Sequence, residues 1–313
     1  MESLRVLSPG GYTTVQDMGR FGYQDMGIPV TGTLDLFAPA LANLLVGNPE
    51  NYAVLEITVI GPVLEVLGAI DVAVTGANIG ITVNDRPMLE WQSIRLEKGD
   101  ILSIQQVKQG CRAYLAVNGG IDVPKVMGSC STYTGGKLGG FGGRILEKGD
   151  VLKSGSANLL DKPHFIPEKM IPDYLSDKMI RAIPGPQDNF FDEGLELFFK
   201  SRFLVTPKAN RMGYRLQGPS IEIKEGMPKS IVSEPSMPGS VQIPADEQPI
   251  ILLVEQTVGG YVKIATIISS DLPKVAQSTP GDTLQFEKID LKTAHRLYNE
   301  QQEKIAKIKT MLE

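Results

Sequence analysis

The polar residues best suited to chemistry gather in one N-terminal stretch of the chain. Gln16, Asp17, Arg20 and Tyr23 bring an amide, a carboxylate, a guanidinium and a phenol within a few residues of a glycine-containing backbone, and Asp35 ends the nearby string Gly-Thr-Leu-Asp. Groups of these types can converge on a small polar ligand when a loop presents them. A loop network that is held together by its own hydrogen bonds has the same composition, so both interpretations stay open.

A second candidate is the glycine-rich segment 135–144, which contains six glycines together with Lys137 and Arg144. Successive glycines let backbone N–H groups turn toward one point, which suits an anion such as a phosphate. The segment is not a P-loop, because Ser131 stands where the first glycine of that motif belongs and Leu138 stands where its hydroxyl residue belongs. A flexible lid or an inter-subunit loop explains the composition equally well.

A third candidate is the segment 255–263, which directly follows the apolar run 250–254. It contains Glu255, Gln256 and Lys263 around a Gly-Gly pair. A carboxylate, an amide and an ammonium at a strand end can bind a substrate. An ordinary hairpin is the alternative interpretation.

Strands must position most of these groups. Short β-branched runs, each bounded by Gly, Pro, Asn or Asp, indicate an all-β fold with a few helices, in barrels or sandwiches. The runs are 63–67, 72–74, 79–83, 101–104, 113–117, 221–223, 250–254 and 264–268.

Two segments predict helices. The apolar, alanine-rich segment 36–46 has Asp35 at its N-terminus as a cap and Gly47 as its stop. From about Leu291 to the end of the chain, apolar residues recur along one helical face among Lys, Glu and Gln. We expect this last helix to pack as a strap on the second domain.

The length of 313 residues predicts two domains, because single hydrophobic cores stop growing at roughly 250–300 residues. The segment 154–176 mixes Pro, Lys, Asp and Ser without a period, as a linker does. We therefore expect an N-terminal domain over residues 1–165 and a C-terminal domain, including the terminal helix, over residues 166–313.

Composition excludes several classes of function. The net charge of −5 and the absence of a Lys/Arg-dense stretch argue against nucleic acid as a partner. No secretory signal and no apolar run of about 18 residues is seen, so we expect no membrane contact and a cytoplasmic location. Cys111 and Cys130 form no CxxC motif, and His164 and His295 are too few for a histidine metal cluster or triad. Acid–base chemistry then falls to carboxylates, Lys or Tyr.

The two halves of the chain repeat four short strings in the same order, which indicates a duplicated β module. The Gly-Pro and Gly-Asp strings are typical of turns between strands. The Arg-x-Gly-Tyr strings present a guanidinium either to a carboxylate or phosphate, or to a surface ion pair. The pairs are Arg20-Phe-Gly-Tyr23 with Arg211-Met-Gly-Tyr214, Gly61-Pro-Val-Leu-Glu-Val66 with Gly218-Pro-Ser-Ile-Glu-Ile223, Asp122-Val-Pro-Lys-Val126 with Asp271-Leu-Pro-Lys-Val275, and Gly149-Asp-Val-Leu152 with Gly281-Asp-Thr-Leu284.

Taken together, seven strings closely resemble the KipA family, whose members are also called the C subunit of 5-oxoprolinase or allophanate hydrolase subunit 2. The resemblance implies two cyclophilin-like β-barrel domains, which agrees with the internal repeat. The strings are Val15-Gln-Asp-Met-Gly-Arg-Phe-Gly-Tyr23, Gly32-Thr-Leu-Asp35, Leu115-Ala-Val-Asn-Gly-Gly-Ile-Asp122, Gly140-Phe-Gly-Gly-Arg144, Arg211-Met-Gly-Tyr-Arg-Leu216, Gly239-Ser-Val-Gln-Ile-Pro244 and Gln256-Thr-Val-Gly-Gly-Tyr261.

The resemblance also implies partners and a reaction. With a KipI-like B subunit and a LamB/YcsF-like A subunit, such a C subunit opens the lactam of 5-oxoproline to glutamate at the expense of ATP, and we expect it to be inactive alone. The site needs cations for phosphate and carboxylate groups, usually with Mg²⁺. We assign catalysis to Arg20, Asp17, Asp35 and Arg211, with Asp17 or Asp35 as a possible Mg²⁺ ligand, and substrate or nucleotide binding to Gln16, Tyr23, Lys137, Arg144, Gln256 and Lys263.

Two other functions are consistent with the same family. One is a biotin-dependent carboxyltransferase component acting on urea or a small amide, with biotin carried by another chain because no Ala-Met-Lys-Met string is present. The other is a non-enzymatic antagonist of a KipI-like kinase inhibitor. Relatives commonly read Thr-Thr-Gly-Gly-Tyr-Pro where this chain reads Thr257-Val-Gly-Gly-Tyr-Val262, so Val258 lacks a hydroxyl that the family carries.

Overall fold

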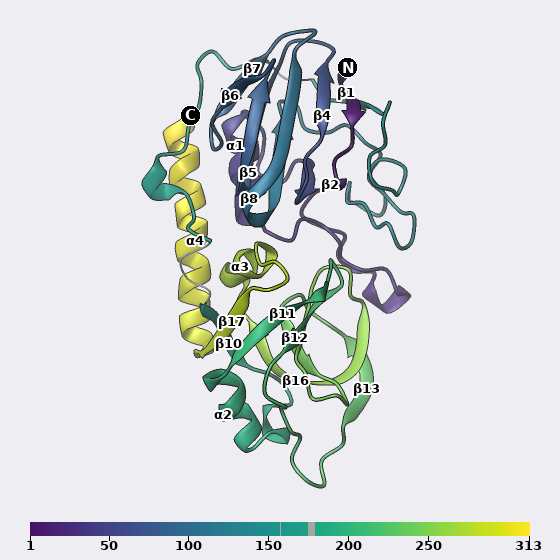
Figure 1. Ribbon diagram of the computed structural model, residues 1–313, viewed down its shortest axis with the longest axis vertical. Helices are drawn as coiled ribbons and strands as arrows, with labels where there is room; N and C mark the ends of the chain where they lie inside the picture. Colours follow the sequence, from purple (N-terminus) through teal and green to yellow (C-terminus); the bar gives the residue numbers. More distant parts are fainter. Residues whose placement is uncertain (157, 175–178) are drawn as a thin grey trace. The chain divides into compact units, whose positions relative to one another are not determined.

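The computed structural model describes residues 1–156, 158–174 and 179–313, which form two compact units (Figure 1). The first unit comprises Met1–Arg20, Thr31–Asp173 and Lys304–Glu313, and the second comprises Phe21–Val30 and Tyr174–Glu303. The expected domain boundary near residue 165 stays a prediction. Part of the expected linker, residues 157, 175 and 176, lies outside the described residues.

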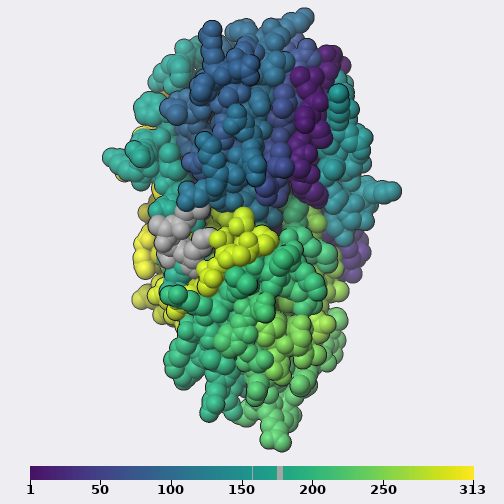
Figure 2. All heavy atoms as spheres, in the orientation of Figure 1, coloured from purple at the N-terminus to yellow at the C-terminus, as the bar shows by residue number. Residues whose placement is uncertain are grey.

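The first unit is a curled half-barrel sheet of nine strands within the described residues. Its main path runs in the order β2-β3-β8-β4-β1-β9, and β5 pairs with β8 while β6 and β7 pair with β5. In Figure 2 the β5–β8 region, in blue, lies beside the N-terminal strand, in purple. The strands are β1 (Glu2–Ser8), β2 (Tyr12–Gln16), β3 (Val54–Thr58), β4 (Val63–Val66), β5 (Ile70–Val83), β6 (Arg86–Met88), β7 (Ser93–Leu96), β8 (Ile101–Val117) and β9 (Val151–Lys153).

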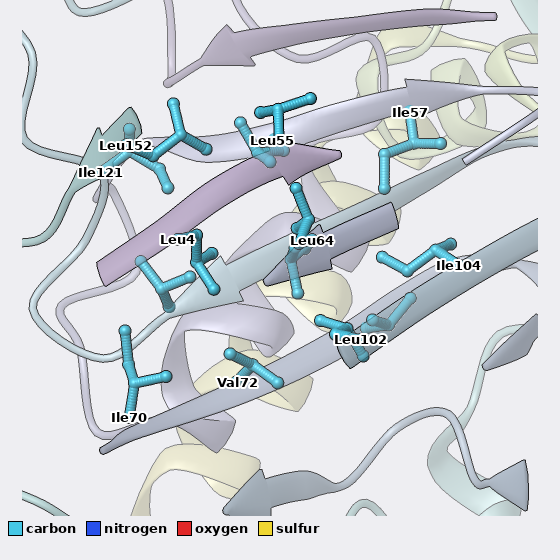
Figure 3. Packing of buried hydrophobic residues seen from close by; sticks show 14 of the residues in the cluster. Leu4, Leu55, Ile57, Leu64, Ile70, Val72, Leu102, Ile104, Ile121 and Leu152 are labelled. Carbon is cyan, nitrogen blue, oxygen red and sulfur yellow. The ribbon is translucent and has the colours of Figure 1, made fainter. Parts of the chain in front are cut away.

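Side chains alternate between the two faces of these strands, and one face carries the apolar core. Leu55, Leu64, Val72 and Leu102 are fully buried among other aliphatic side chains, as Figure 3 shows. The runs predicted at 72–74 and 79–83 belong to one strand, β5, whose register with β8 shifts directly after Gly76. The runs predicted at 101–104 and 113–117 likewise merge into β8.

Within its described residues, the second unit is a closed barrel of seven strands. Its order is β10-β17-β11-β12-β15-β14-β16, and pairing of β16 with β10 closes the ring, while β13 adds to the edge of β16. The mainly β prediction with two barrel-like units is therefore confirmed. The strands are β10 (Met179–Pro184), β11 (Arg202–Ala209), β12 (Gly213–Gln217), β13 (Ser230–Pro235), β14 (Ser240–Ile243), β15 (Ile250–Leu252), β16 (Val258–Ile267) and β17 (Thr283–Lys288).

One predicted strand, at residues 221–223, is not a strand. Ile221 is fully buried, but its N–H donates to the Glu247 carbonyl, and the Lys224 N–H donates to the Phe190 carbonyl. The segment therefore fills the core with an apolar side chain while its backbone is satisfied by loops rather than by a ladder. Hydrophobic type alone does not distinguish these two arrangements.

The two longer predicted helices form, as α1 (Phe37–Leu45) and α4 (Leu291–Leu312), and two shorter ones accompany them, α2 (Glu193–Lys200) and α3 (Leu272–Ala276). Asp35 accepts hydrogen bonds from the N–H groups of Phe37 and Ala38, so the predicted N-terminal cap of α1 is confirmed. We expected α4 to pack on the second domain, but residues 304–313 belong to the first unit, where Lys309 Nζ lies 3.5 Å from Glu50 Oε1.

No helix in the described ranges is both long and apolar enough to span a membrane. The helix α4 has the length, but charged residues recur throughout it.

The repeated Gly-Asp strings are turns, as predicted. In the first unit, Val6 exchanges backbone hydrogen bonds with Asp150 and Gly149. In the second, Val205 exchanges the same two bonds with Asp282 and Gly281. Gly149 and Gly281 both have positive φ, which their lack of a side chain allows. This pair of matching strings therefore marks the same strand-entry turn in both units.

The repeated Asp-x-Pro-Lys strings have different surroundings in the two units. Asp271 is fully buried, and its carboxylate accepts hydrogen bonds from the Arg181 N–H and guanidinium. Asp122 is exposed, and its backbone N–H donates to the Lys153 carbonyl. The same residue types therefore hold an ion pair in one unit only.

The buried ion pair of Asp271 with Arg181 should stabilise the fold, whereas the exposed Asp122 should not. Asp271→Asn leaves the partly exposed Arg181 guanidinium without its carboxylate, and we expect a loss of roughly 2–4 kcal/mol in the free energy of unfolding, measured by urea denaturation. The matched change Asp122→Asn removes an exposed carboxylate and should stay within about 0.5 kcal/mol of wild type. Equal effects of the two substitutions would contradict this assignment.

Candidate functional site

The Asp17 carboxylate organises the polar cluster of the first unit. It accepts hydrogen bonds from the Gly19 N–H, the Ser129 hydroxyl at 2.7 Å, the Cys130 N–H at 2.6 Å and the Ser131 hydroxyl. A carboxylate with four donors has its lone pairs committed to the protein. Asp17 thus ties the end of β2 to the segment 129–131.

Arg20 belongs to the same cluster and is 1% exposed. Its guanidinium donates to the Val126 carbonyl at 2.9 Å, the Ser131 carbonyl at 2.9 Å and the Thr31 hydroxyl at 3.1 Å. The five donors of arginine allow one side chain to join three loops in this way. The structure therefore favours the structural interpretation of Arg20 over a clamp on a ligand.

The glycine-rich segment packs directly on this cluster. A Cβ on Gly139 would lie 2.7 Å from Arg20 Nη2, and a Cβ on Gly140 would lie 1.8 Å from the Thr132 hydroxyl. Lys137 is exposed at a positive φ. Arg144 donates to both carboxylate oxygens of Asp150 at 2.8 Å. These glycines thus permit close packing, and Arg144 is engaged in an ion pair.

A row of polar residues crosses four strands on the sheet face that α1 covers. The register places Thr14 opposite Glu56, Glu56 opposite Tyr114, and Tyr114 opposite Thr75, and each is at most 1% exposed. The Thr75 hydroxyl donates to the Ala38 carbonyl of α1 at 2.7 Å. Sequence analysis missed this row, because its members are adjacent only through strand pairing.

The side chains of this row are buried, and protein groups accept or donate most of their hydrogen bonds. Glu56 accepts a hydrogen bond from the Leu34 N–H, and its other oxygen lies 4.0 Å from Arg112 Nε. Burial, followed by the charges of Glu56 and Asp35, raises the pKa of Tyr114. Gln16 extends the row and donates to the Thr14 hydroxyl at 3.0 Å.

The two expected magnesium ligands are occupied by protein donors. Asp35 is fully buried and caps α1, and Asp17 carries the four hydrogen bonds described above. Within the described part of the chain, no group of three His, Cys, Asp or Glu side chains is arranged to hold a metal ion. The described residues around Asp17 and Asp35 therefore do not fit a magnesium site.

The second unit holds the other predicted residues, Tyr23, Arg211, Gln256 and Lys263. Arg211 forms a nearly buried ion pair with Glu255, with Nε 2.6 Å from Oε1. The Ser236 N–H donates to the Thr257 carbonyl. The Ser236 carbonyl accepts from the amide of Gln24, whose neighbour Tyr23 was predicted from sequence. Gln256, next to Glu255, donates to the Val258 carbonyl.

Lys263 lies on β16 and is 4% exposed. Its ammonium donates to Glu234 Oε1 at 2.6 Å. Gln242, the register partner of Lys263 on β14, is also buried. Gln242 Nε2 and the Ser236 hydroxyl are buried atoms without a hydrogen-bond partner among the described residues.

The structure thus separates the predicted residues into two groups. Gln16, Asp17, Arg20, Asp35, Lys137 and Arg144 lie in the first unit, where Asp17, Arg20 and Asp35 bond to other protein groups and Gln16 Oε1 is a buried atom without a partner among the described residues. The second group, in the second unit, holds Tyr23, Arg211, Gln256 and Lys263. Sequence analysis did not single out Ser236, Gln242 or Glu234, although the motif Gly239-Ser-Val-Gln-Ile-Pro244 contains Gln242.

Comparison with known proteins agrees with the resemblance seen in the sequence. The family model "Carboxyltransferase domain, subdomain A and B" matches residues 26–288. The C subunit of 5-oxoprolinase from Escherichia coli (strain K12) is 38% identical over 301 residues, covering 96% of this chain and 95% of that protein. The urea amidolyase of Lachancea kluyveri is 35% identical over 320 residues, covering 96% of this chain but 18% of that protein. The crystal structure of Kluyveromyces lactis urea carboxylase matches 98% of this chain and 29% of that chain, with a TM-score of 0.92 and 35% identity.

The hydrogen bonds of Arg20 predict a structural effect of its substitution. Arg20→Lys keeps the charge but cannot reach three acceptors, so we expect the free energy of unfolding to fall by about 1.5–3 kcal/mol in urea denaturation. Arg5→Lys, at a surface pair with Glu65, is the matched control and should change stability by less than about 1 kcal/mol. An Arg20→Lys protein with wild-type stability would assign Arg20 to ligand binding instead.

Proposed function

This chain belongs to the family of the carboxyltransferase domain, subdomain A and B, and from that premise we propose that it is the C subunit of an ATP-dependent 5-oxoprolinase. The observation that carries the proposal is the near end-to-end match to a relative of that name, 38% identical with 95% of the relative covered. A second such C subunit, from Haemophilus influenzae, is 35% identical with 93% covered. We propose that the chain works with a KipI-like B subunit and a LamB/YcsF-like A subunit.

The proposed reaction opens a lactam, which is a stable amide. ATP, when bound, would supply a phosphoryl group to the lactam oxygen, which would make the attached carbon electrophilic. Water would then add to that carbon, the ring C–N bond would break with a proton passing to the nitrogen, and hydrolysis of the resulting acyl phosphate would release glutamate and phosphate. Because the described residues of this chain do not fit a magnesium site, we propose that ATP and Mg²⁺ are held mainly by the partner subunits. The contribution of this chain is then to bind and orient the substrate, for which positively charged and neutral hydrogen-bond donors are the suitable groups.

The Ser236 region of the second unit is better suited to this role than the Asp17 region of the first. Asp17 and Arg20 form their hydrogen bonds with other protein groups. Gln242 and Ser236, in contrast, have buried atoms without partners among the described residues. Lys263 and Arg211 add two cationic side chains, each beside a carboxylate. We propose that Arg211, Gln256 and Lys263 belong to the substrate-binding region, with Tyr23 at its border.

A carboxyltransferase component that acts on urea or a small amide is the second candidate. The observation that favours it is the likeness to Kluyveromyces lactis urea carboxylase across 98% of this chain. This chain spans less than a third of that chain and about a fifth of the urea amidolyase from Lachancea kluyveri. Those longer proteins therefore contain large regions that have no counterpart here.

Reconstitution tests the proposed function. We expect the purified chain alone to have negligible activity, and co-purified B-like and A-like partners to form a complex with it that releases glutamate from 5-oxoproline only with ATP. The measurement is glutamate formation with and without each of the three proteins. Turnover by the isolated chain would contradict a shared site, and failure of the partners to associate would contradict the assembly.

The same reconstituted complex separates the two candidate functions. A 5-oxoprolinase should consume 5-oxoproline without any biotinylated protein. Transfer of a carboxyl group from carboxybiotin to urea, with no glutamate from 5-oxoproline, would instead establish the carboxyltransferase function.

A further inference from the structure

We propose that Gln242, Ser236 and Lys263 form the site that binds the carboxylate of the substrate, a small cyclic amide that carries a carboxylate group. This inference rests on the proposed function and adds to it the atoms that recognise the substrate. The three side chains come from β14, from the turn after β13 and from β16 of one barrel. The site therefore lies on paired strands, which hold their side chains in fixed positions.

Two side chains of this cluster, Gln242 and Ser236, have buried hydrogen-bond donors without acceptors among the described residues. Gln242 is 3% exposed and Ser236 is 1% exposed, and neither Gln242 Nε2 nor the Ser236 hydroxyl has a partner in the described ranges. A buried polar atom without a partner costs about 1–3 kcal/mol. An acceptor oxygen from a ligand would recover this free energy for both donors.

The two donors lie close to the same backbone position, Gly259. Gly259 lies against both donors, because a Cβ at that position would be 2.7 Å from Gln242 Nε2 and 3.4 Å from the Ser236 hydroxyl. The two donors therefore both lie beside the Gly259 backbone on β16. Any side chain at position 259 would press on the Gln242 amide, so this arrangement of the donors requires glycine there.

The surroundings of Lys263 indicate that the ligand is negatively charged. The Lys263 ammonium is 4% exposed and already contacts a carboxylate, that of Glu234, at 2.6 Å. Glu234 lies on β13, the strand that pairs with β16 at the end of the sheet order, and its side chain is 45% exposed. A ligand carboxylate can replace Glu234 at the ammonium while the Glu234 side chain turns to solvent, so no charge is left buried and unpaired.

The experiment compares two probes that differ in one group. 5-Oxoproline carries a carboxylate, and 2-pyrrolidinone is the same lactam ring without it. We expect the purified chain to bind 5-oxoproline and not 2-pyrrolidinone at equal concentration, measured by isothermal titration. Lys263→Met should weaken 5-oxoproline binding by about 10- to 100-fold, because it removes a charged hydrogen-bond donor.

Matched variants separate binding from folding. Lys208→Met makes the same change at an exposed position of β11 and should leave affinity unaltered. Glu234→Gln keeps Lys263 but removes the internal competitor, so we expect 5-oxoproline affinity to rise severalfold, an effect that a purely structural ion pair would not produce.

Each outcome bears on the proposal. Unchanged 5-oxoproline affinity in Lys263→Met, absent binding to the wild-type chain, or equal binding of both probes would overturn the site. Binding of 5-oxoproline with the expected variant pattern, but no turnover in the reconstituted complex, would support the site and contradict the proposed function.

Discussion

The first unit depends on one buried arrangement, the Asp17 carboxylate and the Arg20 guanidinium that join the end of β2 to residues 126–131. Asp17 receives four donors, and Arg20 donates to two carbonyls and a hydroxyl. Burying charged groups is costly unless hydrogen bonds replace water, and here the protein supplies them. A Cβ on Gly139 would press on the Arg20 guanidinium, so glycine at this position lets the covering segment pack on the arrangement.

In the second unit, ion pairs lie in the same region as buried polar atoms without partners in the described structure. Around Ser236, the ion pairs Arg211–Glu255 and Lys263–Glu234 are present, but the Gln242 amide and the Ser236 hydroxyl retain buried atoms without partners in the described structure. Since unsatisfied buried groups cost stability, a ligand that supplied acceptors here would stabilise the second arrangement. The first unit also has buried atoms without partners in the described structure, among them Gln16 Oε1 and Thr33 Oγ1.

Local signals in the sequence predicted local structure well. The Asp35 cap, the Gly-Asp turns and both longer helices follow from neighbouring residues, and the mainly β class follows from β-branched runs between turn residues. The row Thr14, Glu56, Tyr114 and Thr75 could not be predicted, because it exists only through the register of four strands. Ser236 and Gln242 could not be predicted as part of one cluster for the same reason. Strand pairing places Gln242 beside Lys263, and a turn brings Ser236 close to Gly259 on the same strand as Lys263. The polar string and the internal repeat drew attention to Arg20, but its role depends on acceptors more than 100 positions away along the chain.

We propose that Gln242, Ser236 and Lys263 of the second unit hold the substrate, while the Asp17–Arg20 cluster of the first unit is structural. A crystal structure of the chain grown with 5-oxoproline would decide between these two regions. We expect the ligand carboxylate within hydrogen-bond distance of Lys263 Nζ and Gln242 Nε2, with Glu234 turned to solvent and the Asp17 and Arg20 contacts unchanged. A ligand bound at Asp17 and Arg20, with the Lys263–Glu234 pair intact, would contradict it.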